Sequence, residues 1–196
     1  MYFTLTTANV LFHFDYATEV FTPFIPPTAL AGPLGVFYAS DGNIWITYFL
    51  ANKIAKFDVQ TKHFTEYRVP LPGGAAPAVI RAESPKGTLW STCLVGGSIA
   101  RITMATGEIT LLQDTLSSLP SENTVDGDGN VWYSTIGRGT LNKIDPVTNK
   151  VTQVAQPGIL GLPLPAVSAD LPIMYGPGNA LWFTELANNR IGRYQL

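Results

Sequence analysis

The sequence predicts an all-β protein, a β-propeller of about five four-stranded blades in which the terminal blades are incomplete. Three observations carry this prediction. A motif of turn, apolar residue and aromatic residue recurs through the chain, most clearly at residues 179–185. Its copies lie roughly 42 to 50 residues apart, close to the ~40–45 residues of a blade with four short strands. Gly and Pro contribute 18 and 15 of the 196 residues, as a fold with many turns requires.

Each repeat begins, in this interpretation, with an aromatic strand that follows a turn. The key aromatic residue falls at Tyr2, Trp45, Trp90, Trp132 and Trp182. Because one such aromatic residue occurs in each repeat, we interpret these residues first as packing residues between blades, and not as catalytic or binding residues. A second strand follows, in which apolar and polar residues alternate as in a half-buried strand. Its copies are residues 9–15, 52–58, 97–103, 139–145 and 188–194.

A third, mostly polar strand follows a turn in four repeats, and we predict it to be the outer strand. Its copies are residues 19–22, 64–67, 108–111 and 151–154. A fourth strand is short, apolar and preceded by Pro, which suits an inner strand that lines a central channel. Its copies are residues 35–38, 78–81, 123–125 and 173–175.

The chain therefore starts and ends within a blade. We predict one domain over residues 1–196, with repeats near 1–33, 34–76, 77–119, 120–171 and 172–196. Incomplete blades expose strand edges that invite pairing. Two further interpretations stay open: the chain is a fragment of a larger propeller, or a homodimer forms through the incomplete blades.

Composition narrows the function classes. Charged residues are 13% of the chain against about 25% in typical domains, and the net charge is −2 without any basic run. Nucleic acid is therefore not an expected partner. No apolar run reaches the roughly 18 residues that span a membrane, so no membrane association is expected. The first residues lack signal-peptide features, and we expect a cytoplasmic protein. A single cysteine, Cys93, excludes an intramolecular disulfide.

Three stretches of one repeat carry a family resemblance. Residues 41–47 read Asp-Gly-Asn-Ile-Trp-Ile-Thr, residues 52–56 read Asn-Lys-Ile-Ala-Lys, and residues 64–67 read Phe-Thr-Glu-Tyr. Together they resemble the virginiamycin B lyase (streptogramin lyase) family of propellers. This resemblance implies an enzyme that opens a cyclic depsipeptide by elimination. It also implies a Mg²⁺ ion held by two glutamates, with a histidine nearby.

The residues match that implied site at one position only. Glu185 corresponds to one family glutamate. The second glutamate position is Ala169 and the histidine position is Leu171, and Asp170 replaces the missing carboxylate only if the register slips by one. One glutamate is not a magnesium site, because Mg²⁺ needs several oxygen ligands. We therefore predict no metal site and no cofactor. The family resemblance leaves Mg²⁺ open as an alternative whose second ligand is missing, and streptogramin cleavage itself is not supported.

The resemblance places a pocket at one channel mouth, between the ends of the aromatic strands and the starts of the inner strands. We predict Glu185 and Tyr48 as catalytic residues, with Glu185 as a base or orienting carboxylate and Tyr48 as a hydrogen-bond donor. The predicted substrate-binding residues are Leu34, Cys93, Glu122, Ile136, Leu171 and Asn188. Most of these positions are apolar, which favours an apolar small molecule as ligand.

The alternative interpretations of these positions are structural: a solvated carboxylate at Glu185, rim packing at Tyr48, an inert buried thiol at Cys93 and a plain ion pair between Glu122 and Arg81. An apolar, proline-rich connection at residues 156–165 is either a lid over the mouth or a loop packed on a neighbouring blade. Two functions stay open. One is a metal-independent lyase or cyclase that acts on a natural product. The other is a non-catalytic ligand- or protein-binding scaffold, or an inactive partial lyase homologue.

Overall fold

The computed structural model describes residues 1–113, 119–136, 140–155, 170–185 and 189–196. Over these residues it contains 18 strands in five antiparallel sheets, and no helix. The first and last sheets have three strands and the others have four. The prediction of an all-β propeller with incomplete terminal blades is confirmed. None of the described segments forms a helix that could cross a membrane.

Within every sheet the strands follow one another in chain order. The first sheet contains β1 (Tyr2–Leu5), β2 (Val10–Phe14) and β3 (Phe21–Phe24). The second contains β4 (Pro33–Tyr38), β5 (Ile44–Tyr48), β6 (Lys53–Phe57) and β7 (Phe64–Arg68). The third contains β8 (Pro77–Glu83), β9 (Thr88–Cys93), β10 (Ser98–Thr103) and β11 (Glu108–Gln113).

The last two sheets repeat this meander. The fourth contains β12 (Pro120–Val125), β13 (Val131–Thr135), β14 (Thr140–Ile144) and β15 (Val151–Ala155). The fifth contains β16 (Asp170–Gly176), β17 (Ala180–Glu185) and β18 (Arg190–Gln195). The first sheet therefore begins with an aromatic strand and has no inner strand. The fifth has no outer strand among the described residues.

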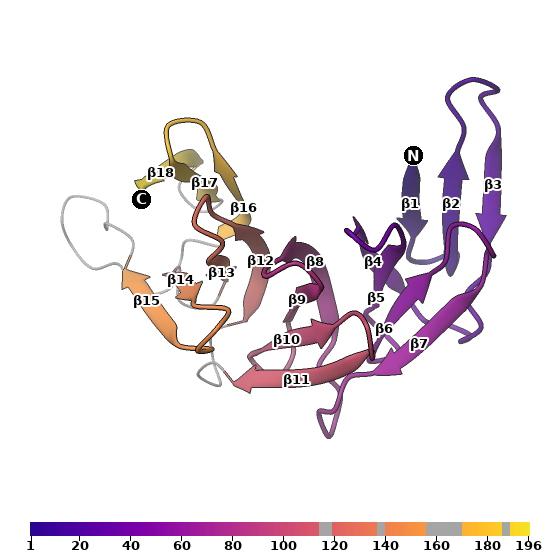
Figure 1. Cartoon of the computed structure of the whole chain (residues 1–196), viewed down its shortest axis with the longest axis horizontal. Coiled ribbons are helices and arrows are strands. Elements are labelled where there is room, and N and C mark those ends of the chain that lie inside the picture. Colours follow the sequence, from indigo (N-terminus) through magenta and orange to yellow (C-terminus); the bar gives the residue numbers. More distant parts are fainter. Residues whose placement is uncertain (114–118, 137–139, 156–169, 186–188) are drawn as a thin grey trace.

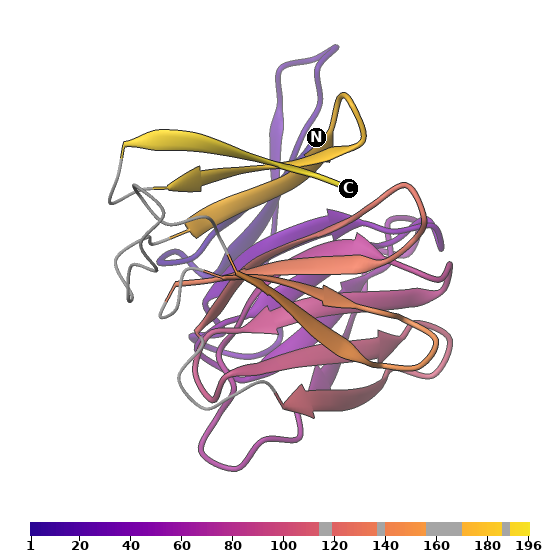
Figure 2. The same ribbon diagram turned by 90° about the vertical axis from the view of Figure 1, so that its left-hand side faces the viewer.

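The five sheets form an open arc, with β4, β8, β12 and β16 on its inner side (Figure 1). Each inner strand contacts the next one along the arc, and β1 contacts β4. The arc is open between the first and fifth sheets. The view turned by 90° shows the β16–β18 sheet facing the viewer (Figure 2).

The core consists of apolar layers between successive sheets. The tryptophan of each central sheet points toward the following sheet, where apolar side chains cover it. Trp90, for example, packs against Val131 and Tyr133 of the fourth sheet. Trp45 contacts the third sheet in the same way, and Trp132 contacts the fifth. These residues pack the blades together, as their spacing predicts.

Candidate functional site: the inner strands and the channel mouth

The start of each inner strand lies beside the end of the neighbouring aromatic strand. The Cα register pairs Pro33 with Tyr48 and Asp170 with Glu185. The other two central sheets have matching pairs, Pro77 with Cys93 and Pro120 with Thr135. A register shift follows each pair, as in a β-bulge. Bulges re-aim side chains at barrel rims and active sites. The strand ends chosen from sequence therefore do lie at one common end of their sheets.

A hydroxyl side chain joins successive sheets at this end. Thr4 Oγ1 donates a hydrogen bond to Leu34 O at 2.7 Å, Thr47 Oγ1 to Ala78 O at 2.8 Å, and Thr92 Oγ1 to Ser121 O at 2.8 Å. Each bond runs from an aromatic strand to the bulge of the next sheet. These contacts were not predicted from the sequence. Their signal is a Thr or Ser two residues after the key aromatic in all five repeats: Thr4, Thr47, Thr92, Ser134 and Thr184.

A groove of about 370 Å³ lies along the middle of the inner strands. All four inner strands line it, with Val36, Phe37, Tyr38, Arg81, Asn123, Thr124, Ile173 and Met174. Its volume falls in the usual range for small-molecule sites, about 300–1,000 Å³. The walls are mainly apolar, and Arg81 is the single charged residue in the part of the lining that the structure describes. The inner strands were predicted to line a channel, but the residues named from sequence were those at the strand starts.

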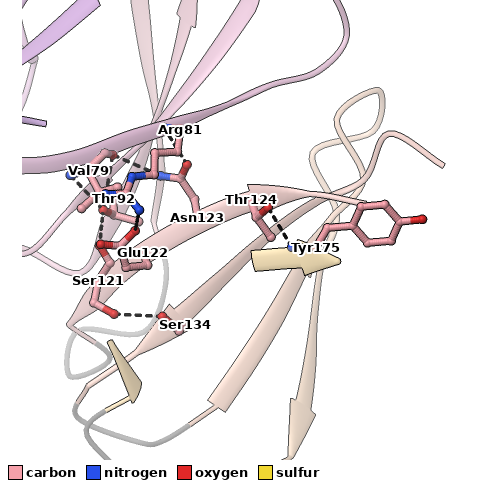
Figure 3. Close-up of polar contacts among 9 residues, drawn as sticks. All are labelled: Val79, Arg81, Thr92, Ser121, Glu122, Asn123, Thr124, Ser134 and Tyr175. Carbon is pink, nitrogen blue, oxygen red and sulfur yellow. Dashed lines mark hydrogen bonds and ion pairs between the residues drawn. The ribbon is translucent and has the colours of Figure 1, made fainter. Parts of the chain in front are cut away.

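Arg81 and Glu122 form an ion pair between β8 and β12 (Figure 3). Arg81 Nη1 lies 3.4 Å from Glu122 Oε2, and the two side chains are 55% and 16% exposed. Burial raises the pKa of the Glu122 carboxyl, and the Arg81 charge partly opposes this effect. From the sequence, this pair was considered as a plain structural contact. The structure adds that its cationic partner faces the groove.

Asn123 ties the same two inner strands together through its side chain, which is almost fully buried (1% exposed). Asn123 Oδ1 accepts a hydrogen bond from the Arg81 backbone N–H at 3.0 Å, and Asn123 Nδ2 donates to Val79 O at 3.1 Å (Figure 3). Nearby, the Ser121 and Ser134 hydroxyls lie 2.9 Å apart. The backbone that carries Arg81 is therefore held in place by buried polar contacts.

Glu185 ends β17 and is half-buried. It lines a separate cavity of about 400 Å³ with Thr184, Asn189, Arg190 and Ile191. The Cα register places it opposite Arg190 on one side and Asp170 on the other. The predicted site residue Asn188 and the connection at residues 156–165 lie outside the described residues. Leu171 belongs to the first part of β16.

Tyr48 and Cys93 were expected at the surface of the pocket, and the structure places both in the core with 0% exposure. Burial raises the pKa of the Tyr48 hydroxyl, which has no hydrogen-bond partner among the described residues. Burial also raises the pKa of the Cys93 thiol to about 12. Both side chains therefore turn inward between two sheets, and not toward the surface of the pocket. Their roles in binding and catalysis stay predictions.

Leu34 and Ile136 are closer to their expected positions. Leu34 is 41% exposed, within the bulge of β4, and its carbonyl accepts the Thr4 hydroxyl. Ile136 is half-buried just after β13, and its N–H donates to Leu119 O at 3.0 Å. These two side chains lie at the predicted mouth, whereas the groove lies further along the inner strands.

The described residues show no cluster of metal-binding side chains. They contain no group of three or more His, Cys, Asp or Glu side chains that could bind a metal ion. Ala169 lies outside the described residues. Neither histidine lines the groove: His13 packs on Tyr2 in the first sheet, with ring centroids 4.6 Å apart, and His63 precedes β7.

The overall structure is similar to that of solved lyase structures. The chain is similar to virginiamycin B lyase from Staphylococcus aureus, with a TM-score of 0.84 and 27% identity over 100% of this chain and 66% of that chain. A streptogramin B lyase structure matches with the same score and identity over 64% of its length. Hydrazine synthase from Kuenenia stuttgartiensis matches at 14% identity with a TM-score of 0.72, a likeness of fold alone.

The chain spans about two thirds of the length of the lyase structures that it matches. No curated protein sequence matches it. The model of the virginiamycin B lyase family matches residues 1–196. The resemblance drawn from the repeat motifs is thus confirmed: the chain belongs to the virginiamycin B lyase family.

Proposed function

We propose that the protein binds a small, largely apolar molecule in the groove along its inner strands. The observation that carries this proposal is the groove itself, about 370 Å³ in volume and lined from four sheets. Apolar side chains such as Val36, Phe37 and Ile173 supply contact area, while Thr124 and Arg81 supply polar groups. A mainly apolar concavity with a few fixed polar groups is the usual form of a small-molecule site.

Binding can be tested with N-phenyl-naphthylamine, a neutral apolar dye that fluoresces in apolar surroundings. Met174 is 62% exposed and lines the groove, so Met174→Glu introduces a charge there at little expense to folding. We expect at least a tenfold loss of dye affinity, on the order of 1.4 kcal/mol. Val147→Glu, at an 83% exposed position outside the groove lining, is the matched control. Equal dye binding by the two variants contradicts the proposal.

Cleavage of streptogramins is not part of this proposal. A catalytically inactive histidine-to-alanine variant of the S. aureus lyase is among the similar structures, bound to quinupristin. In the present chain the histidine position implied by the family resemblance is Leu171. Incubation with quinupristin and Mg²⁺ followed by mass spectrometry should show no ring-opened product. Thermal unfolding with Mg²⁺ and with EDTA should give the same midpoint, and a midpoint raised by Mg²⁺ contradicts this part.

A metal-independent lyase or cyclase is the second candidate, and Glu185 favours it. Such a reaction needs a group that accepts a proton, and a half-buried carboxylate in a cavity of about 400 Å³ can do so. With a natural-product substrate that is turned over, Glu185→Gln should abolish turnover and leave binding in place. Unchanged turnover removes Glu185 from the mechanism. If no substrate is turned over while the groove still binds ligand, the protein is a non-catalytic binding propeller.

A further inference from the structure

The guanidinium group of Arg81 is the polar feature of the groove with the most unused binding capacity. An arginine side chain carries five N–H donors. Among the described residues, the guanidinium of Arg81 contacts one polar partner, Glu122, at 3.4 Å. Its side chain is 55% exposed and lines the groove. A planar group with several available donors, set in an apolar concavity, is suited to bind a carboxylate in a bidentate manner.

The existing partner satisfies Arg81 poorly. Charge-assisted N–H···O contacts are usually about 2.7–2.9 Å long, shorter than the 3.4 Å between Arg81 and Glu122. Glu122 Oε2 is buried and accepts no hydrogen bond from the described residues. The pair is therefore a charge contact without a hydrogen bond. A ligand anion in the groove can approach the guanidinium more closely than Glu122 does.

The surroundings of Arg81 hold its backbone in position. Its backbone N–H is bound by the buried amide of Asn123, so β8 is fixed against β12 at this point. Among the described residues that line the groove, no other is charged, and the rest of the lining is apolar or neutral.

We propose that the ligand of the groove is an anion, a small molecule with an apolar body and one carboxylate group that pairs with Arg81. This inference rests on the proposed binding function and narrows its ligand class. Glu122 competes with the ligand for Arg81. Removal of the Glu122 charge should therefore strengthen binding of the anion, and removal of the Arg81 charge should weaken it.

Two probes of one shape test the proposal: naphthoate, which carries a carboxylate, and naphthamide, which is neutral. With the wild-type protein, calorimetry should show naphthoate binding about tenfold more tightly than naphthamide. Arg81→Gln should remove this preference, and Arg81→Lys should keep part of it, because the charge stays while the planar fork is lost. Glu122→Gln should tighten naphthoate binding and leave naphthamide binding unchanged. Arg68→Gln, at an exposed residue of the outer strand β7, is the matched control.

The outcomes distinguish a failure of binding in the groove from a failure of the carboxylate preference at Arg81. If both probes bind with equal affinity to the wild-type protein, the anion proposal is wrong and the groove remains a binding site. If the preference for naphthoate survives in a folded Arg81→Gln protein, Arg81 is not the anion site. If neither probe binds, the proposed binding function fails together with its ligand class. Circular dichroism of each variant confirms that the comparison is made between folded proteins.

Discussion

The third and fifth sheets carry the same sequence pattern in different surroundings. Trp90 is 0% exposed and Trp182 is 38% exposed, although each follows the same kind of turn. Their local contacts are alike: Arg101 lies 5.9 Å from the Trp90 ring and Arg193 lies 5.7 Å from the Trp182 ring. The difference is that residues of the fourth sheet cover Trp90.

The second strands of these two sheets differ in the same way. Ile99 of β10 is 1% exposed, whereas the corresponding Ile191 of β18 is 74% exposed. Ile99 belongs to the cluster that Trp90 forms with the fourth sheet. No described residues cover Ile191 to that extent. The repeat thus determines which face of a sheet is apolar, while the adjacent sheet determines how much that face contributes to stability.

Alanine substitution of each tryptophan should give the largest difference in stability between the third and fifth sheets. Trp90→Ala should lower the free energy of unfolding by about 3–5 kcal/mol, because it leaves a large cavity between two sheets. Trp182→Ala should lower it by roughly 1–2 kcal/mol, because the indole already contacts solvent. Urea unfolding followed by circular dichroism measures both values. Equal losses would mean that the face of the fifth sheet is covered in solution.

The hydroxyl contacts between sheets give a smaller contrast. Thr92→Val removes a hydroxyl while it keeps the shape of the side chain. It should reduce the free energy of unfolding by about 1–3 kcal/mol, because Ser121 O loses its buried donor. Thr184 holds the equivalent position in the fifth sheet, and its hydroxyl makes no hydrogen bond with the described residues. Thr184→Val should change stability by less than about 0.5 kcal/mol. Urea unfolding of both variants measures the two changes. Similar losses of unfolding free energy for Thr92→Val and Thr184→Val would contradict a stabilising role that is specific to the Thr92 hydrogen bond.

Much of the fold could be predicted from the sequence because the repeat is local. The aromatic residue, the alternating second strand and the Pro-preceded inner strand each follow from nearby residues, and all 18 strands were expected. The bulges were not predicted, and they decide which residues face the channel. Tyr48 and Cys93 end their strands at the predicted mouth, yet both side chains point into the core. One residue of register separates a pocket position from a core position.

The candidate site depends on contacts between repeats, which a pattern within one repeat does not contain. Arg81 and Glu122 were both noted as charges on inner strands, and their pairing was considered. Their side-chain exposures differ, 55% and 16%, and only Arg81 of the two lines the groove. The side chain of Asn123 binds the backbone of the preceding sheet, and no pattern in the sequence pointed to this role. Such residues become visible only when neighbouring sheets are placed side by side.

Burial between sheets favours the apolar side chain of Trp90, but it should lower the stability of the folded state at the carboxylate of Glu122. Of the tryptophan, threonine and glutamate substitutions, we expect the one at Glu122 to have the smallest effect. Burial raises the pKa of the Glu122 carboxyl above its ordinary value of 4.5, against the opposing charge of Arg81. The folded state therefore binds this proton more tightly than the unfolded state. The resulting loss of stability begins as pH rises through 4.5 and is complete above the pKa of the folded state.

Glu122→Gln removes that charge and should raise the free energy of unfolding at pH 7 by less than about 1 kcal/mol. The gain should disappear as pH falls below 4.5, where the wild-type carboxyl is protonated in both states. Urea unfolding between about pH 4 and pH 8 measures it. In an Arg81→Gln background the gain should increase, because the compensating cation is absent. A variant that is less stable than wild type at pH 7 would show that the ion pair outweighs the burial of the carboxylate, and that Glu122 holds Arg81 more firmly than the 3.4 Å contact indicates.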